Sequence, residues 1–134
     1  MARVKPSGSC VRFGKNTKPV KSADYRAWVK KLPCIVTGQS GVEAAHLSTA
    51  SQRYAHNGRG KSQKASDRWV LPLASDVHRR QHEANELAFW ECHGINPYVA
   101  CLVLHGLYSD GKDGAIDQAS ALIQSRIFHM GYPS

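Results

Sequence analysis

Two histidines stand at a spacing that suits metal binding. His78 and His82 are four residues apart, so on a helix both side chains leave the same face and two imidazoles can reach one divalent ion. Such a pair alone more often reflects packing, and its context therefore matters. A short apolar segment that ends in His46, a long basic loop and the apolar run 70–73 all precede the pair. This order favours a site built from both parts of the chain.

The elements that must position these histidines follow from the patterning of apolar residues and breakers. Ser22 is a candidate N-cap for a helix that Pro33 ends. Two short apolar segments, 34–38 and 42–47, suggest a small hairpin, and a returning strand should follow the loop 48–68. Helical patterns are expected over 23–32, from Ser75 or Asp76 to Gly94, over 97–108 and over 115–130. The sequence therefore predicts an α+β fold in one domain, 22–134, preceded by a basic and mobile arm, 1–21.

The charge of the chain points to a polyanionic partner. The 134 residues carry 18 Lys and Arg against 10 Asp and Glu, a net charge of +8, which favours a nucleic acid over an acidic small substrate. DNA is the expected partner; its form, whether duplex, single strand, junction or filament-bound, stays open, and RNA is an alternative. No apolar run approaches the roughly 20 residues of a membrane span, so we expect no membrane partner. The basic side chains expected to contact phosphate are Arg53, Arg59, Lys61, Lys64, Arg68, Arg79 and Arg80.

Cysteine usage and the first residues suggest a reducing compartment. Cys10, Cys34, Cys92 and Cys101 form no C-x-x-C pair, and the start of the chain lacks the apolar stretch of a secretory signal. We therefore expect a cytoplasmic protein without disulfides, in which Cys92 and Cys101 are small buried side chains. His56 lies in the basic loop, where it could contact phosphate, although exposure in a loop explains it more simply.

Several motifs, taken in order, resemble the HNH endonucleases of the ββα-metal class. They are Glu43-Ala-Ala-His46, Gly58-Arg-Gly-Lys61, Ser66-Asp-Arg-Trp-Val-Leu-Pro-Leu73, His78-Arg-Arg-Gln-His82, Phe89-Trp90 and His93-Gly-Ile-Asn-Pro97. The resemblance covers about residues 32–105 and is greatest to the phage-associated branch that includes recombination-enhancement nucleases. It implies a small ββα-metal core, a β-hairpin plus a metal-binding helix, with packing helices at both ends, the C-terminal ones within 97–130.

The resemblance also implies an activity and roles for particular residues. DNA phosphodiester bonds would be hydrolysed with weak sequence specificity, in the cytoplasm of a bacterial host, with a recombination protein as a candidate partner. His46 would be the general base, a role that suits an imidazole because the unperturbed pKa of histidine side chains, about 6.5, lies near neutrality. His78 and His82 would hold one divalent ion, Mg²⁺, Mn²⁺ or Zn²⁺, with water and phosphate oxygen in the remaining positions.

The chain departs from the family pattern beside the general base. Many relatives have a metal ligand directly before that histidine, where this chain has Ala45. Either His46 itself coordinates the metal, or Asp67 or Glu43 completes the ligand set. Trp69 stands roughly where the family has asparagine, and Asp67 is the candidate to take over its bracing hydrogen bonds in the catalytic site.

A second departure concerns structural zinc. Relatives often carry two ligand pairs, which here read Cys34-Ile-Val-Thr37 and Ala74-Ser-Asp-Val77. Three of the four ligands are replaced together, so we expect no structural zinc and a core held instead by the C-terminal helices. Two rival interpretations stay open: a DNA-binding module of the same fold that has lost turnover, and a protein in which the three histidines hold a purely structural metal.

Overall fold

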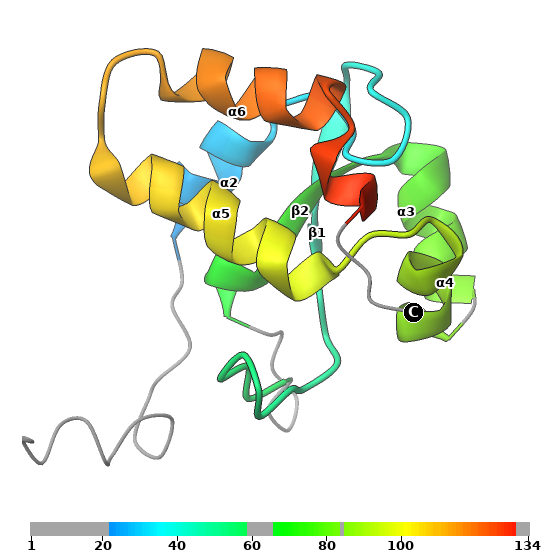
Figure 1. Cartoon of the computed structure of the whole chain (residues 1–134). Helices are drawn as coiled ribbons and strands as arrows, with labels where there is room; N and C mark the ends of the chain where they lie inside the picture. Colours follow the sequence, from blue (N-terminus) through cyan, green and yellow to red (C-terminus); the bar gives the residue numbers. More distant parts are fainter. Residues whose placement is uncertain (1–21, 59–65, 84, 131–134) are drawn as a thin grey trace, which may run out of the picture.

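Five α-helices and a two-stranded antiparallel sheet make up the described part of the chain, which is an α+β fold (Figure 1). The structure is a computed structural model that describes residues 22–58, 66–83 and 85–130. The elements are α2 (Ala23–Val29), β1 (Val42–His46), β2 (Val70–Ala74), α3 (Ser75–Glu83), α4 (Glu86–Cys92), α5 (Pro97–Asp110) and α6 (Ala115–Gln124), with short 3₁₀ turns at Asp67–Trp69 and Ile127–Met130. The expected arm, 1–21, lies outside the described residues.

The register of the sheet determines which segments meet. Val42 pairs with Ala74 and His46 pairs with Val70, so the end of β1 lies beside the residues that enter β2. Successive side chains of a strand point to opposite faces, and Ala44 accordingly packs with α2 while Ala45 is buried in the larger core. The start of α3 follows β2 directly, which places this helix near the beginning of β1.

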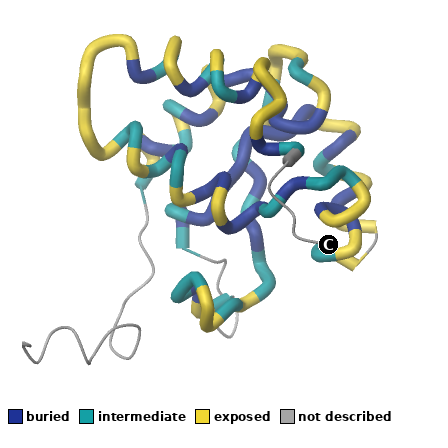
Figure 2. The backbone as a smooth tube through the Cα atoms, in the orientation of Figure 1, coloured by how far each residue is buried: buried dark blue, intermediate teal, exposed yellow. Residues whose placement is uncertain are grey.

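The core lies on both faces of this small sheet. On one face Tyr25 and Val29 of α2 pack on Val70, and all three are at most 1% exposed. On the other face Leu71 and Leu73 join side chains from α3, α4, α5 and α6, and Trp90 is fully buried among them. Figure 2 shows the burial following both strands and the inner sides of the helices. Strand β1, which carries both Glu43 and His46, is thus packed from both sides.

The predicted hairpin between 34–38 and 42–47 is wrong. Residues after Cys34 form a turn, in which the Gly38 N–H donates to the Cys34 carbonyl at 2.7 Å with Gly38 at φ 81°. Ile35 contributes a single hydrogen bond to the Pro72 carbonyl, on β2. The segment is too short, between Pro33 and Gly38, to extend as a strand.

The helices also differ from the expected ranges. α2 ends at Val29 instead of residue 32, and the helix expected over 115–130 is α6 followed by a separate 3₁₀ turn, with Arg126 at φ 61° between them. The stretch from Ser75 to Gly94 is two helices, because Asn85 interrupts it and caps α4 with its side chain on the Ala88 N–H at 3.0 Å. The predicted cap of the first helix is confirmed, since the Ser22 hydroxyl accepts from the Tyr25 N–H. Cys101 is buried as expected, but Cys92 is exposed at the end of α4.

No helix of the described ranges is both long enough and apolar enough to cross a bilayer.

Candidate functional site

His46 forms a close pair with a buried carboxylate. Its Nε2 lies 2.7 Å from Asp67 Oδ1, and the two side chains are 15% and 6% exposed. His46 is the last residue of β1 and Asp67 begins the turn that leads into β2, so the sheet register itself brings them together. The side chain that sequence reasoning named as the substitute for the family asparagine therefore contacts the predicted general base.

Asp67 is fixed in place by the start of α2. Its Oδ2 accepts the Ser22 N–H at 2.7 Å and lies 3.4 Å from Nε of Arg26. Charge-assisted hydrogen bonds of this kind are stronger than those between neutral groups. Neither Ser22 nor Arg26 was singled out as a site residue from the sequence, because only the folded chain shows that the N-cap of a helix sits on Asp67.

The pairing assigns the protons of the His46 ring. A carboxylate accepts hydrogen bonds only, so Nε2 of His46 carries the proton and Nδ1 keeps its lone pair. An imidazole held in this way presents a single basic atom and gains a negative neighbour that stabilises it once protonated. The His46–Asp67 pair, called here the dyad, has the arrangement of a general base with its orienting carboxylate.

The second cluster joins α3 to β1. Nδ1 of His78 lies 2.7 Å from Glu43 Oε1, and Nε2 of His78 lies 3.0 Å from Nε2 of His82. The two rings are therefore side by side on one face of α3, as their spacing predicts. We call Glu43, His78 and His82 the histidine-pair cluster.

This geometry fits a bound cation. Because Nδ1–H of His78 donates to Glu43, its Nε2 has a free lone pair that faces Nε2 of His82, and either a proton or a cation must lie between the two nitrogens. Zinc–nitrogen bonds of 2.0–2.1 Å at tetrahedral angles separate two ligand nitrogens by about 3.3 Å, close to the 3.0 Å found here. A carboxylate on the far nitrogen of a ligating histidine is the common second partner at metal sites.

Glu43 lies on an exposed edge of the sheet, between helices α2 and α3. The hydrogen bond from His78 lowers the pKa of Glu43, and Lys30, at the end of α2, adds to this shift. β1 pairs only with β2 in the described sheet, so its outer edge carries no further strand there. This edge, with α2 on one side and α3 on the other, is open to a ligand.

The two clusters share strand β1 but do not merge into one group. Glu43 and His46 are three positions apart on β1, so they leave opposite faces. Within the described residues, no set of three or more His, Cys, Asp or Glu side chains is arranged to hold a metal ion. In the structure His46 contacts Asp67, and the histidine pair contacts Glu43 instead of His46.

The far end of α3 reaches the chain just beyond His46. Nε2 of Gln81 donates to Glu86 Oε2 at 3.2 Å, and the same carboxylate accepts the N–H groups of Ser48 and Thr49 at distances of 2.8–3.1 Å. Through Gln81 and Glu86, the last turn of α3 is thus connected to the chain that follows His46, while His78 contacts Glu43 near the beginning of β1. Glu86 was not recognised from the sequence, because a lone glutamate in the first turn of a helix is ordinary.

His56 is an interior residue, which corrects the expectation of an exposed loop histidine. It is 2% exposed, its Nε2 pairs with the Leu47 carbonyl, and its Nδ1 accepts the Gly58 N–H at 2.8 Å. The ring stacks on Trp69 with centroids 4.6 Å apart. Burial lowers the pKa of His56, which is therefore neutral in the fold. Trp69, at the register of the family asparagine, is thus a core side chain.

The predicted phosphate contacts are spread over different surfaces. Arg53 and Arg79 are exposed, and Arg79 lies about 100° around α3 from His78. Arg80 points away from the histidine pair; burial lowers the pKa of His93, and the charge of Arg80 adds to that shift. Arg68 is half-buried, with an Nε atom that has no hydrogen-bond partner in the described chain. Arg59, Lys61 and Lys64 lie outside the described residues.

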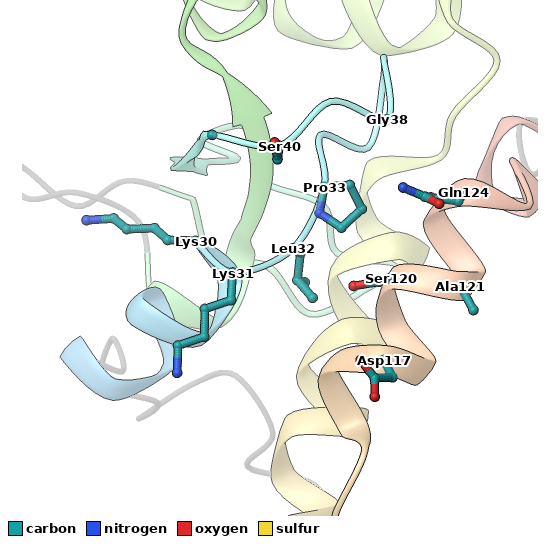
Figure 3. Close-up of a pocket in the computed structure, with 11 residues that line it drawn as sticks. Lys30, Lys31, Leu32, Pro33, Gly38, Ser40, Asp117, Ser120, Ala121 and Gln124 are labelled. Atoms are coloured by element: carbon teal, nitrogen blue, oxygen red, sulfur yellow. The ribbon is translucent and has the colours of Figure 1, made fainter.

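A hollow of about 540 Å³ lies apart from both clusters, between the turn at 38–41 and α6. Figure 3 shows Leu32 and Pro33 facing Ser120 and Gln124 across it, while Lys30 extends away from α6. Its lining contains no histidine or cysteine, and its single carboxylate is that of Asp117. Cys34 is fully buried nearby in the core.

A sequence model of one family matches residues 6–109, which include α2, both strands, α3, α4 and nearly all of α5. The chain belongs to the DUF968 family. The description of that family is a protein of unknown function. No curated protein and no solved structure matches the chain. Both clusters fall inside the matched region, whereas α6 lies beyond it.

Proposed function

We propose that this DUF968 protein is a metal-dependent endonuclease that hydrolyses DNA phosphodiester bonds, built on a ββα-metal core formed by β1, β2 and α3. The observation that carries the proposal is the presence of two complementary clusters on one short strand. The dyad offers a general base, and the histidine-pair cluster offers ligands for a divalent cation. Hydrolysis of a phosphodiester needs both functions.

The dyad supplies the base. Nδ1 of His46 takes a proton from water, and the negative charge of Asp67 stabilises the imidazolium that results. Ser22 and Arg26 hold Asp67 so that the ring does not need to reorganise during the reaction. Removal of this proton makes the water a stronger nucleophile toward phosphorus.

The histidine-pair cluster supplies the cation site. His78 and His82 would hold the ion through Nε2, and Glu43 keeps His78 in the tautomer that binding requires. A divalent ion bound there would supply positive charge to the phosphate and to the leaving oxygen. His46 is not needed as a ligand, because an open site keeps positions for water and substrate.

The exposed edge of β1 is where a phosphate would meet both clusters. A DNA backbone that crosses this edge would have His46 on its α2 side and His78 with His82 on its α3 side. Arg26 and Lys30, one turn apart on α2, add positive charge along the same edge. The net charge of +8 favours a polyanion at this surface.

Cleavage of supercoiled plasmid DNA tests the proposal. The unmodified protein should nick the plasmid in the presence of Mg²⁺, Mn²⁺ or Zn²⁺ and lose this activity with a chelator. His46→Ala should abolish nicking while DNA affinity stays within about twofold, because the ring acts only on the water. His93→Asn, at the C-cap of α4 and outside both clusters, is the matched control and should cleave normally.

Two results would contradict the proposal. DNA binding without cleavage in all three metals would favour the inactive binding module. Loss of folding on chelation, seen as a cooperative change in circular dichroism, would favour a structural metal.

A further inference from the structure

The segment after β1 is a small, tightly held hairpin instead of the long loop that the sequence suggests. Ser51 and His56 exchange both backbone hydrogen bonds at 2.9 Å, and the Ala55 N–H donates to the Gln52 carbonyl. Ala55 has a φ of 61°, a conformation that residues other than glycine seldom adopt. Figure 1 shows this segment, the 51–56 hairpin, projecting beyond the end of β1 and away from α6.

The hairpin is braced from several sides. Tyr54 stacks on Tyr98 of α5 with centroids 5.1 Å apart and an interplanar angle of 5°, and its hydroxyl accepts from Asn96 at 3.0 Å. His56 anchors the other end in the core. These polar and aromatic contacts fix the turn at both ends, while Gln52 and Arg53 between them are exposed. Strained, over-determined backbone of this kind is concentrated at functional sites.

The tip presents one cation that has no acidic partner. Gln52 and Arg53 are exposed, and the Arg53 guanidinium carbon lies 5.6 Å from the centre of the Tyr54 ring, over its face. No ion pair involves Arg53 within the described ranges. The guanidinium is therefore held in a defined direction by a ring that is itself fixed, and its charge remains available.

The contacts of Tyr54 bear on whether this surface suits single-stranded or duplex DNA. Single-stranded DNA is bound through aromatic rings on which bases stack. The Tyr54 ring stacks on Tyr98, and the Arg53 guanidinium also lies over it, so a stacking base would compete with both contacts. A single projecting arginine suits instead the minor groove of a duplex, where narrow A·T tracts attract arginine by their negative potential.

We propose that the partner of this surface is duplex DNA and that the 51–56 hairpin inserts Arg53 into its minor groove beside the phosphate to be cleaved. This rests on the proposed nuclease function for its polyanionic partner. The hairpin begins five residues after His46, so one duplex can contact both. Reading the major groove would require several base-contacting side chains, and the tip has only Gln52 and Arg53.

Binding of the protein to DNA, measured with a chelator present so that no cleavage occurs, tests the proposed contact of Arg53 with the minor groove. Fluorescence anisotropy would compare a duplex with a central A·T tract, the same duplex with G·C, and one of its single strands. Arg53→Ala should weaken binding to the A·T duplex about tenfold and change single-strand binding less than twofold. Lys112→Ala, an exposed lysine between α5 and α6, is the charge-matched control and should leave all three affinities within twofold. Arg53→Gln should behave as Arg53→Ala, with an unchanged melting temperature.

Two further measurements sharpen the test. Tyr54→Leu removes the ring under the guanidinium and should weaken binding to the A·T duplex less than Arg53→Ala does. A small molecule that binds the minor groove should compete with the unmodified protein for the duplex but not with Arg53→Ala. Equal losses for Arg53→Ala on duplex and single strand, or no loss at all, would overturn the inference.

The inference and the proposed function fail in different ways. Arg53→Ala should raise the KM for duplex cleavage while kcat stays near that of the unmodified protein, the reverse of His46→Ala. Normal cleavage together with unchanged binding by Arg53→Ala would overturn the groove contact alone. Absence of both binding and cleavage in the unmodified protein would overturn both.

Discussion

Replacing Asp67 with asparagine tests the dyad most finely, because the shape of the side chain is kept. Three donors converge on the carboxylate: the Ser22 N–H at 2.7 Å, His46 Nε2 at 2.7 Å and Arg26 Nε at 3.4 Å. An amide has one acceptor oxygen and an NH₂ group that itself donates. One of the two short hydrogen bonds must therefore be lost, or the His46 ring must change tautomer.

The magnitude follows from the burial of the site. A hydrogen bond to a charged, buried group contributes about 1.5–3 kcal/mol, whereas the Arg26 contact is partly exposed and contributes less. Asp67→Asn should thus lower the free energy of unfolding by about 2 kcal/mol. A tautomer change places the proton on Nδ1 and removes the basic lone pair. The corresponding substitution in a Ser-His-Asp triad lowers kcat about 10⁴-fold, and we expect a loss of about 10²–10⁴-fold here.

Two assays separate these effects. Urea denaturation gives the stability of Asp67→Asn, and plasmid cleavage at a temperature where the variant is fully folded gives kcat. DNA affinity should stay unchanged, because Asp67 is only 5% exposed. Full activity in a folded Asp67→Asn variant would refute the role of the carboxylate, and a loss of activity no larger than the loss of folded protein would reduce that role to stability.

Three other predictions concern the groups around the dyad. Glu43→Gln should weaken zinc or manganese binding about 10–100-fold in calorimetry; unchanged affinity would exclude Glu43 as the partner of His78. Because burial lowers the pKa of His56, the free energy of unfolding should fall as pH drops below about 6.5, by up to about 1.4 kcal/mol per pH unit, and His56→Gln should make this slope shallower; an equal slope would contradict a buried neutral ring. Glu86→Ala should speed amide exchange at Thr49 at least about tenfold and leave Leu71 protected; protection retained at Thr49 would show that the carboxylate does not hold this turn.

Local signals predicted the elements that depend on local chemistry. The Ser22 cap, the second strand and the helices that begin near Pro97 and Ala115 follow from capping residues, apolar runs and breakers. The side-by-side placement of His78 and His82 follows from helical geometry alone. These features need no knowledge of the tertiary fold.

Features that depend on the pairing register or on distant partners were not predicted. Pairing of β1 with β2 instead of 34–38 brings Glu43 to α3 and His46 to Asp67. The residues 48–58 contain few aliphatic side chains and look like an open loop, yet a carboxylate from α4 and a tyrosine from α5 order them. Glu43 was named only as one of several candidates to complete the ligand set, because strand alternation does not reveal which helix covers each face.

The position of the two clusters around one ion is the central claim, and diffraction from crystals soaked with Mn²⁺ or Zn²⁺ and a short duplex tests it most directly. Anomalous scattering should place one ion on Nε2 of His78 and of His82, with a phosphate between that ion and Nδ1 of His46, within about 6 Å, or two hydrogen-bond lengths. An ion bound elsewhere, or a phosphate on that ion whose every oxygen lies beyond about 6 Å from Nδ1 of His46, would leave phosphodiester hydrolysis without a base and contradict the account.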